Sequence, residues 1–260
     1  MAAIEENLNE QQGHWILARL GKRVLRPGGR ELTNRMIDAL NIDPGDDIVE
    51  FAPGVGFTAS LACAKDPRSY TGVDRNREAL SLADKSIRHP NKRMILADAS
   101  ETGLPSESAT KVYGEAMLTM QSKLQKKAIV QEAARLLKPG GYYGMHELSI
   151  YPDDISEEIK RGLYRDLSLH IKVNARPLTT KEWTEHLESE GFEIVTVDHN
   201  PMYLLELKRM VQDEGIPRTL RIAFNLLTHP AYFKRVKRMR STFRHYYPHM
   251  QAIAIIARKK

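Results

Sequence analysis

Short apolar runs alternate with longer helical patterns over residues 46–150, and this alternation predicts repeated β–α units around a parallel sheet. Further apolar runs near the C-terminus add two strands to the five expected in this part of the chain. The predicted strands cover residues 47–52, 70–74, 93–98, 111–115, 142–148, 192–197 and 251–257. The pattern therefore predicts an α/β protein with a seven-stranded, mostly parallel sheet and helices on both faces.

The remaining segments are predicted to be helical. Residues 1–45 are expected to form an N-terminal helical lid, from which His14 would reach the cleft, and residues 46–260 the main domain. Residues 203–247 are helical in pattern throughout and are expected as an insertion before the last strand. Thr179 or Thr180, followed by Glu182, has the spacing of a helix N-cap.

Composition excludes several classes of protein. With 42% hydrophobic and 28% charged residues among 260, the chain can bury a core and is not disordered as a whole. The apolar run of residues 252–257 is far shorter than the roughly 20 residues of a membrane-spanning helix. Cys63, the only cysteine, can form neither an internal disulfide nor a thiolate metal site. We expect a cytoplasmic protein without a metal site.

Charge is distributed unevenly along the chain. Residues 201–260 hold 13 basic and 3 acidic side chains, whereas the first 200 residues hold 26 basic and 30 acidic ones. A uniformly basic nucleic-acid binder would not show this distribution, although phosphate binding on an RNA substrate is a further alternative for the local excess. Helix 231–247 combines an apolar stripe with a basic face, which fits a lid over the active site, a peripheral membrane contact or a solvated surface.

A glycine-containing loop follows the first predicted strand and opens a helix. Gly54 and Gly56 let the backbone turn tightly and approach a ligand. The run from Gly54 to Ala59 also satisfies a dinucleotide fingerprint, and Asp74 stands 18 residues after Gly56, as a ribose-binding acid should. Glu50 disfavours a dinucleotide, because a carboxylate there would repel a pyrophosphate and attract a cation. A sulfonium nucleoside without phosphate fits better, and a nicotinamide cofactor is the alternative.

These features together resemble the class I S-adenosylmethionine-dependent methyltransferases, in the broad group labelled methyltransferase type 11. The resemblance covers residues 46–150 and implies a Rossmann-like sheet with an antiparallel last strand. Ala52 stands where the family's first motif usually has its first glycine. The resemblance implies that Asp74 binds the ribose hydroxyls and that Asp98 and Ala99 contact the adenine. The full set of implied cofactor-binding residues is Gly29, Glu50, Ala52, Pro53, Gly54, Gly56, Asp74, Arg75, Asp98, Ala99 and Glu115.

Methyl transfer from a sulfonium is a direct displacement that mainly needs alignment of the reactants and exclusion of water. His146 and Glu147, at the end of the fifth strand, are the candidate catalytic residues. After Glu115 comes Ala-Met-Leu-Thr, which is not the Asn/Asp-Pro-Pro-aromatic signature associated with methylation of amines on bases. We expect a small-molecule acceptor. The alternatives are a lipid or isoprenoid acceptor at a membrane surface and a non-catalytic S-adenosylmethionine-binding scaffold, and a homodimer is left open.

Overall fold

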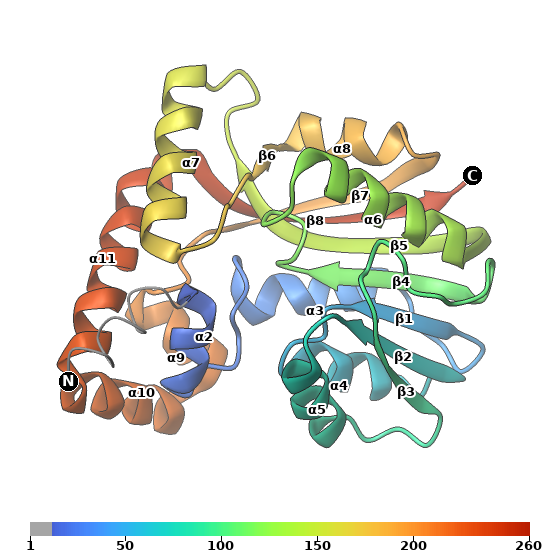
Figure 1. The fold of residues 1–260 in the computed structure, drawn as a ribbon, viewed down its shortest axis with the longest axis horizontal. Helices are drawn as coiled ribbons and strands as arrows, with labels where there is room; N and C mark the ends of the chain where they lie inside the picture. Colours follow the sequence, from blue (N-terminus) through green and yellow to red (C-terminus); the bar gives the residue numbers. More distant parts are fainter. Residues whose placement is uncertain (1–11) are drawn as a thin grey trace.

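The computed structural model describes residues 12–260, which form one mixed sheet flanked by helices (Figure 1). The strands are β1 (Asp47–Phe51), β2 (Ser69–Asp74), β3 (Lys92–Leu96), β4 (Ala109–Glu115), β5 (Leu137–Ile150), β6 (Leu178–Thr179), β7 (Phe192–Pro201) and β8 (Met250–Lys259). The helices are α2 (Gly13–Arg19), α3 (Gly29–Ala39), α4 (Phe57–Cys63), α5 (Arg77–Ser86), α6 (Lys123–Leu136), α7 (Glu157–Ile171), α8 (Thr180–Glu188), α9 (Leu207–Glu214), α10 (Ile216–Thr228) and α11 (Pro230–Tyr246), followed by the 3₁₀ turn η1 (Tyr247–His249).

The strands lie in the order β3-β2-β1-β4-β5-β8-β7, and the last strand, β8, runs antiparallel to both of its neighbours. This arrangement confirms the predicted Rossmann-like sheet. One further strand, β6, pairs with the end of β5. The sequence analysis missed β6 because a strand of two residues leaves no periodic pattern.

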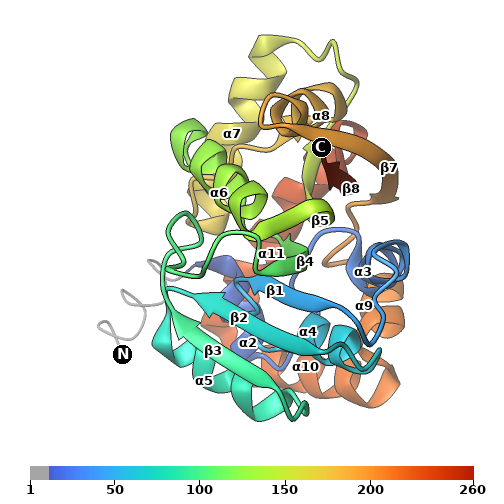
Figure 2. The same cartoon turned by 90° about the vertical axis from the view of Figure 1, so that its right-hand side faces the viewer.

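Each face of the sheet is covered by its own set of helices (Figure 2). Alternate side chains of β1 point to opposite faces of the sheet and pack against different sets of helices. Val49 packs into the core cluster that contains α6 and α8, whereas Ile48 packs into the cluster that contains α3, α4 and α5. The sheet is thus buried on both sides, as expected for parallel strands rich in branched apolar residues.

Five helices, α2, α7, α9, α10 and α11, gather beyond the carboxyl ends of the parallel strands, on the left of Figure 1. The helices predicted for residues 203–247 are confirmed over residues 207–246, with breaks at Gly215 and His229, whereas residues 203–206 form a turn before α9. Thr179 caps α8 in a complete capping box with Glu182, as the spacing predicted. The lid predicted for residues 1–45 includes residues 1–11, which lie outside the described residues, and its role as a lid stays a prediction.

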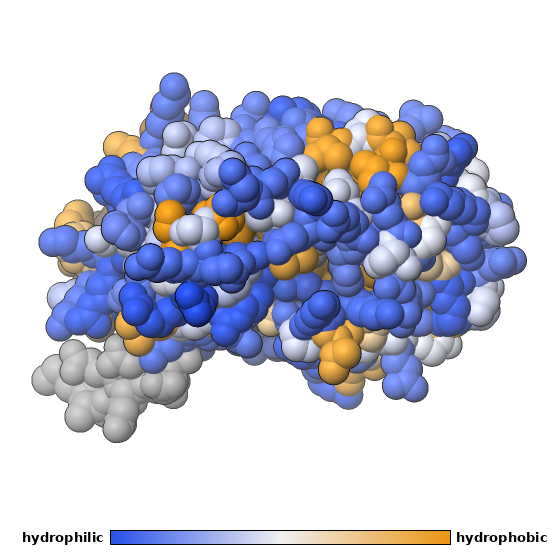
Figure 3. All heavy atoms as spheres, turned by 90° about the horizontal axis from the view of Figure 1, so that it is seen from above, coloured by the Kyte–Doolittle hydropathy of each residue, from blue (hydrophilic) through white to orange (hydrophobic). Residues whose placement is uncertain are grey.

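The surface seen from above the sheet is mainly hydrophilic, with its apolar side chains in separate groups (Figure 3). Across residues 12–260, no helix is both long enough and apolar enough to cross a membrane.

Candidate functional site

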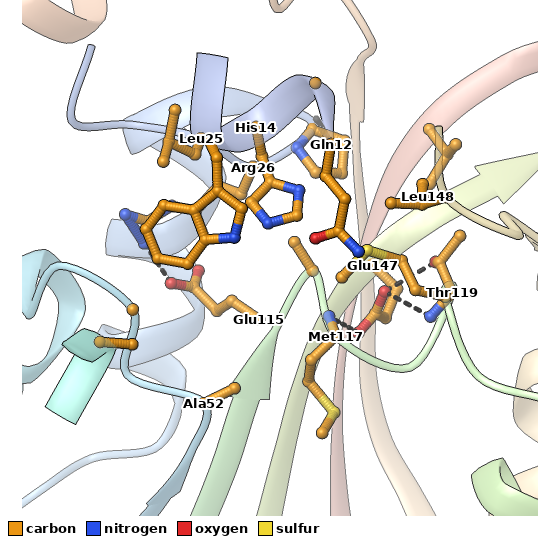
Figure 4. Close-up of a pocket in the computed structure, with 18 of the residues that line it drawn as sticks. Gln12, His14, Leu25, Arg26, Ala52, Glu115, Met117, Thr119, Glu147 and Leu148 are labelled. Carbon is orange, nitrogen blue, oxygen red and sulfur yellow. Dashed lines mark hydrogen bonds and ion pairs between the residues drawn. The ribbon is translucent and has the colours of Figure 1, made fainter. Parts of the chain in front are cut away.

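A cavity of about 660 Å³ lies between the carboxyl ends of the strands and the helices gathered there (Figure 4). The loops after β1, β2, β3 and β4, together with the end of β5, form one side of it. The other side comes from α2, residues 171–175, residues 202–204 and α11. This is where an open parallel sheet is expected to bind its ligand.

The loop after β1 adopts a backbone that favours glycine at three positions. Ala52, Gly54 and Gly56 have φ values of +54°, +56° and +78°. A Cβ on Gly54 would meet only the Ala52 carbonyl, 4.0 Å away, so this glycine leaves its part of the cavity open. Gly56 has a different role: a Cβ there would lie 2.0 Å from Ser86 Oγ, because α4 packs closely on α5 at this point.

Glu50 lies buried at the end of β1 and lines the cavity. Its Oε2 accepts hydrogen bonds from the Tyr70 hydroxyl at 2.5 Å and the Tyr113 hydroxyl at 2.8 Å. Burial raises the pKa of Glu50 to about 7, against the lowering effect of the two tyrosines. The carboxyl group therefore titrates near neutrality and would become ionised when a cation is bound beside it.

Two further carboxylates follow the next strands. Asp74 ends β2 and accepts the Asn76 amide at 2.8 Å, and burial raises its pKa. Asp98 comes two residues after β3, where its Oδ1 accepts bonds from the amide and hydroxyl of Ser100 and from Gln125. These hydrogen bonds fix the orientation of both side chains at the cavity wall.

Glu115, at the end of β4, is the centre of a buried polar cluster. Its Oε2 accepts hydrogen bonds from Arg26 Nη1 and from the Thr58 hydroxyl. Its Oε1 accepts the Thr33 hydroxyl at 2.7 Å and lies 2.6 Å from His146 Nδ1. Burial opposes ionisation of Glu115, but Arg26 and His146 hold its pKa well below the usual range. The carboxylate is therefore ionised and joins four segments of the chain.

His146 lies behind Glu115, fully buried, and is not among the residues that line the cavity. Its second ring nitrogen, Nε2, lies 2.6 Å from the Pro27 carbonyl oxygen. Both ring nitrogens of His146 therefore have a polar partner inside the protein. His146 was expected to lie close to the acceptor; the structure instead separates it from the cavity, because the sheet register turns it toward Glu115.

Glu147 does line the cavity, but its carboxylate holds the loop after β4 in place. It accepts the backbone N–H groups of Met117, Leu118 and Thr119 and the Thr119 hydroxyl, at 2.7–3.0 Å. Burial raises the pKa of Glu147, and these hydrogen bonds act in the opposite direction. The catalytic role predicted for His146 and Glu147 stays a prediction, and both residues have structural partners.

All the predicted cofactor-binding residues except Gly29 and Gly56 line this one cavity. Those that do are Glu50, Ala52, Pro53, Gly54, Asp74, Arg75, Asp98, Ala99 and Glu115. Gly29 instead faces Asp213 of α9, which would lie 2.5 Å from a Cβ at this position. The acidic residues at the strand ends could be predicted from the sequence because each stands at, or just after, the end of a predicted strand.

The opposite side of the cavity is largely apolar, and sequence reasoning missed most of it. His14 lines it as expected, and Figure 4 shows this residue and Gln12 across the cavity from Glu115 and Glu147. Burial lowers the pKa of His14. The apolar lining residues of this side include Trp15, Leu17, Leu25, Met202, Leu204, Met239 and Phe243. They come from segments far apart in the chain, which no local pattern connects.

Arg26 was also missed by the sequence analysis. It lines the cavity, binds Glu115 and lies over the Phe57 ring, with 5.1 Å from Cζ to the ring centroid. Within residues 12–260 no group of three or more His, Cys, Asp or Glu side chains is arranged to hold a metal ion.

Known proteins resemble this chain in both sequence and fold. A family model described as a methyltransferase domain matches residues 48–141. A Haemophilus influenzae protein, described as uncharacterized, is 31% identical over 254 residues, covering 96% of this chain and 99% of its own length. The ubiquinone/menaquinone biosynthesis C-methyltransferase UbiE of Syntrophotalea carbinolica is 30% identical over 125 residues, covering 48% of this chain and about half (51%) of that enzyme.

Among solved structures, phosphoethanolamine N-methyltransferase 2 of Haemonchus contortus shares the fold. Its TM-score is 0.71 at 17% identity, over 95% of this chain and 57% of that one, and it was solved with phosphomonomethylethanolamine and S-adenosylhomocysteine. The sheet order, the glycine loop after β1, the acidic strand ends and these relatives lead to one assignment. The chain contains a class I S-adenosylmethionine-dependent methyltransferase domain, which the family model matches over residues 48–141.

Proposed function

We propose that this methyltransferase acts on a small organic acceptor with an apolar body, which binds on the helical side of the cavity. The observation that carries this proposal is the division of the cavity into an acidic side at the strand ends and an apolar side under α2 and α11. A cationic nucleoside fits the first side, and an uncharged or weakly polar molecule fits the second.

The strand-end side has the groups that S-adenosylmethionine requires. Asp74 would accept hydrogen bonds from the ribose hydroxyls, and Asp98 with Ala99 would contact the adenine. Glu50 would face the positively charged amino acid part, where its ionised form is favoured by the cation. Gly54 leaves open the space that a side chain would occupy. When bound, S-adenosylmethionine supplies an electrophilic methyl group.

The protein's own contribution is alignment of the two reactants and exclusion of water. Arg26 and Glu115 lie where the two sides of the cavity meet, and Thr33, Thr58 and His146 fix their positions. We propose His146 as a positioning residue for Glu115, because it has no surface in the cavity.

An acceptor hydroxyl would also require a proton acceptor. His14 is placed for this role, because it lines the acceptor side and burial lowers its pKa, which favours the neutral imidazole at pH 7.

Calorimetric titration with S-adenosylmethionine and S-adenosylhomocysteine tests the cofactor side. We expect both to bind, and Asp74→Ala to weaken binding by about 10- to 100-fold, as loss of charge-assisted hydrogen bonds costs about 1.5–3 kcal/mol. Glu78→Ala is the matched control, since Glu78 is an exposed acid on the adjacent helix α5. Absence of binding, or equal binding by both variants, would contradict the proposed cofactor site.

A further inference from the structure

The second helix of the insertion, α10, carries a continuous apolar stripe that faces solvent. Ile216, Leu220, Phe224 and Leu227 are 64%, 64%, 65% and 76% exposed. They recur at steps of four, four and three residues, so they share one face of the helix. In the part of the chain that the structure describes, this is the longest such exposed run, and it lies at the lower edge of the molecule in Figure 1.

The two helices that carry and flank this stripe are basic and contain no acid, and the side chain of Glu214, just before α10, is buried and paired with Lys22 and Arg218. Residues 216–246 include no aspartate or glutamate. Exposed basic side chains lie on both α10 and α11, namely Arg221, Lys234, Lys237 and Arg238. Two other arginines of α11, Arg240 and Arg244, are held by Glu206 at 2.7 and 2.8 Å.

We propose that α10 docks this protein on the surface of an anionic phospholipid membrane. The exposed apolar stripe would enter the boundary between head groups and acyl chains, and the neighbouring lysines and arginines would face the phosphates. A single helix lying in the plane of the membrane interface accounts for both the exposed apolar stripe and the basic side chains near it. The proposal does not depend on the identity of the methyl acceptor.

Charge favours a membrane over the other two kinds of partner. A second copy of this chain would bring two acid-free basic surfaces together around the stripe, which like-charge repulsion disfavours. A nucleic acid would attract the basic residues, but it gives no reason for exposed leucine and isoleucine side chains, since its binding relies on phosphate contacts and on stacking with aromatic groups.

The membrane contact predicted through helix 231–247 stays a prediction, and the structure shows how the side chains of this helix are distributed. The apolar stripe of that helix packs inward, because Met239, Phe243 and Tyr246 are buried in a core cluster. Its outer face is mainly basic and also exposes Phe233, whereas the continuous apolar stripe of the proposed docking surface lies on α10. The inner side of α10 packs through Ile222 on Ile16 of α2, the helix that lines the acceptor side of the cavity.

Co-sedimentation with vesicles tests this docking surface. Vesicles of phosphatidylcholine mixed with phosphatidylglycerol should bind the full chain, whereas phosphatidylcholine alone should bind it weakly. Leu220→Ser with Phe224→Ser should lower the partition coefficient by at least about tenfold. Lys234→Gln and Lys237→Gln should each lower it by about fivefold, and only for the anionic vesicles.

The matched control is Leu124→Ser, which removes an 82%-exposed leucine from α6. It should bind vesicles like the unmodified chain, and all variants should retain S-adenosylmethionine binding, which shows that they are folded. The proposal is overturned if the chain does not bind anionic vesicles or if the stripe variant binds as well as the parent. It is also overturned if the stripe variant only converts a dimer into a monomer, because the stripe would then belong to a second copy of the chain.

Discussion

The strand-end side of the cavity is built from β1, β2, β3, β4 and β5 and the loops that follow them, whereas the helical side combines α2, residues 171–175, residues 202–204 and α11. On the first side, the register of the parallel strands fixes where each functional side chain lies. On the second side, the segments that the structure describes share no strand ladder, and their positions depend on apolar packing and a few buried polar contacts. Changes on the first side should therefore affect the ligand, and changes on the second should affect the local fold.

The contacts that hold the helical side connect α9 to the segment before α3 and to the first turn of α3. Glu214 Oε1 accepts the amides of Arg23 and Val24, both at 2.8 Å, and Asp213 Oδ1 accepts the amide of Arg30 at 2.9 Å. Lys22 Nζ lies 3.8 Å from Asp213 and 3.6 Å from Glu214, and burial lowers its pKa. These carboxylates anchor the insertion to the N-terminal segment that contributes Arg26 to the cavity.

Glu115→Ala should have the largest effect, because Glu115 links both sides of the cavity. Its removal leaves the buried Arg26 without its counter-ion and His146 Nδ1 without its partner, and breaking such a buried ion pair costs about 3–5 kcal/mol. Urea unfolding at pH 7 measures the loss, and S-adenosylmethionine binding should weaken as well. The exposed Glu101→Ala variant is the control and should be neutral. A loss below about 1 kcal/mol would show that the cluster does not hold the two sides together.

Asp213→Ala should come next, with a local effect on the helical side. The amide of Arg30 and the ammonium of Lys22 each lose a buried partner, which costs about 1–3 kcal/mol. Hydrogen exchange should become faster in α9 and α10, while the affinity for S-adenosylmethionine stays the same. Gln212→Ala, at the neighbouring exposed position, is the control. If the affinity for S-adenosylmethionine falls together with the hydrogen-exchange protection of α9, the strand-end side and the helical side of the cavity are not independent.

The difference between the strand-end side and the helical side of the cavity also explains which residues could be predicted from the sequence. Glu50, Asp74 and Asp98 were predicted because each stands at or just after a predicted strand, so local pattern and function coincide. Arg26 was missed because its partner Glu115 is 89 residues away and nothing near it marks a site. Gly29 was assigned to the cofactor from sequence, yet its lack of a side chain accommodates Asp213. Contacts between distant segments leave no periodic signal.

Glu50 makes the strand-end side sensitive to pH. Its pKa is raised from 4.5 to about 7, so its protonated form stabilises the folded protein at low pH, and this contribution is lost as pH rises through about 7. A bound cation favours the ionised form and must displace the proton below pH 7. We therefore expect S-adenosylmethionine affinity to rise by about tenfold between pH 6 and pH 8.

Calorimetry in buffers with different ionisation enthalpies measures both this affinity and the proton released. Glu50→Gln keeps the shape of the side chain, and it should flatten the pH dependence and abolish the proton release near pH 7. A Glu50→Gln variant with an unchanged pH profile would show that another group is responsible for the pH dependence.

Ala52→Gly should have the smallest effect, and it should raise the stability of the folded protein, whereas Glu115→Ala and Asp213→Ala should lower it. Ala52 has a φ of +54°, a left-handed backbone that costs a residue with a Cβ about 1–2 kcal/mol. Glycine removes this strain, but it loses more conformational freedom on folding and gives up the packing of the methyl group on the core cluster. The net gain should be about 0.5–1 kcal/mol, or a rise in Tm of about 1–3 °C. The amide would still donate to the Val73 carbonyl, 2.8 Å away, so cofactor affinity should not change.

Ala64→Gly is the control for this prediction. Ala64 has an ordinary φ of −68°, so its replacement by glycine should lower Tm. A lower Tm for Ala52→Gly as well would mean that the methyl contact outweighs the backbone strain in this loop.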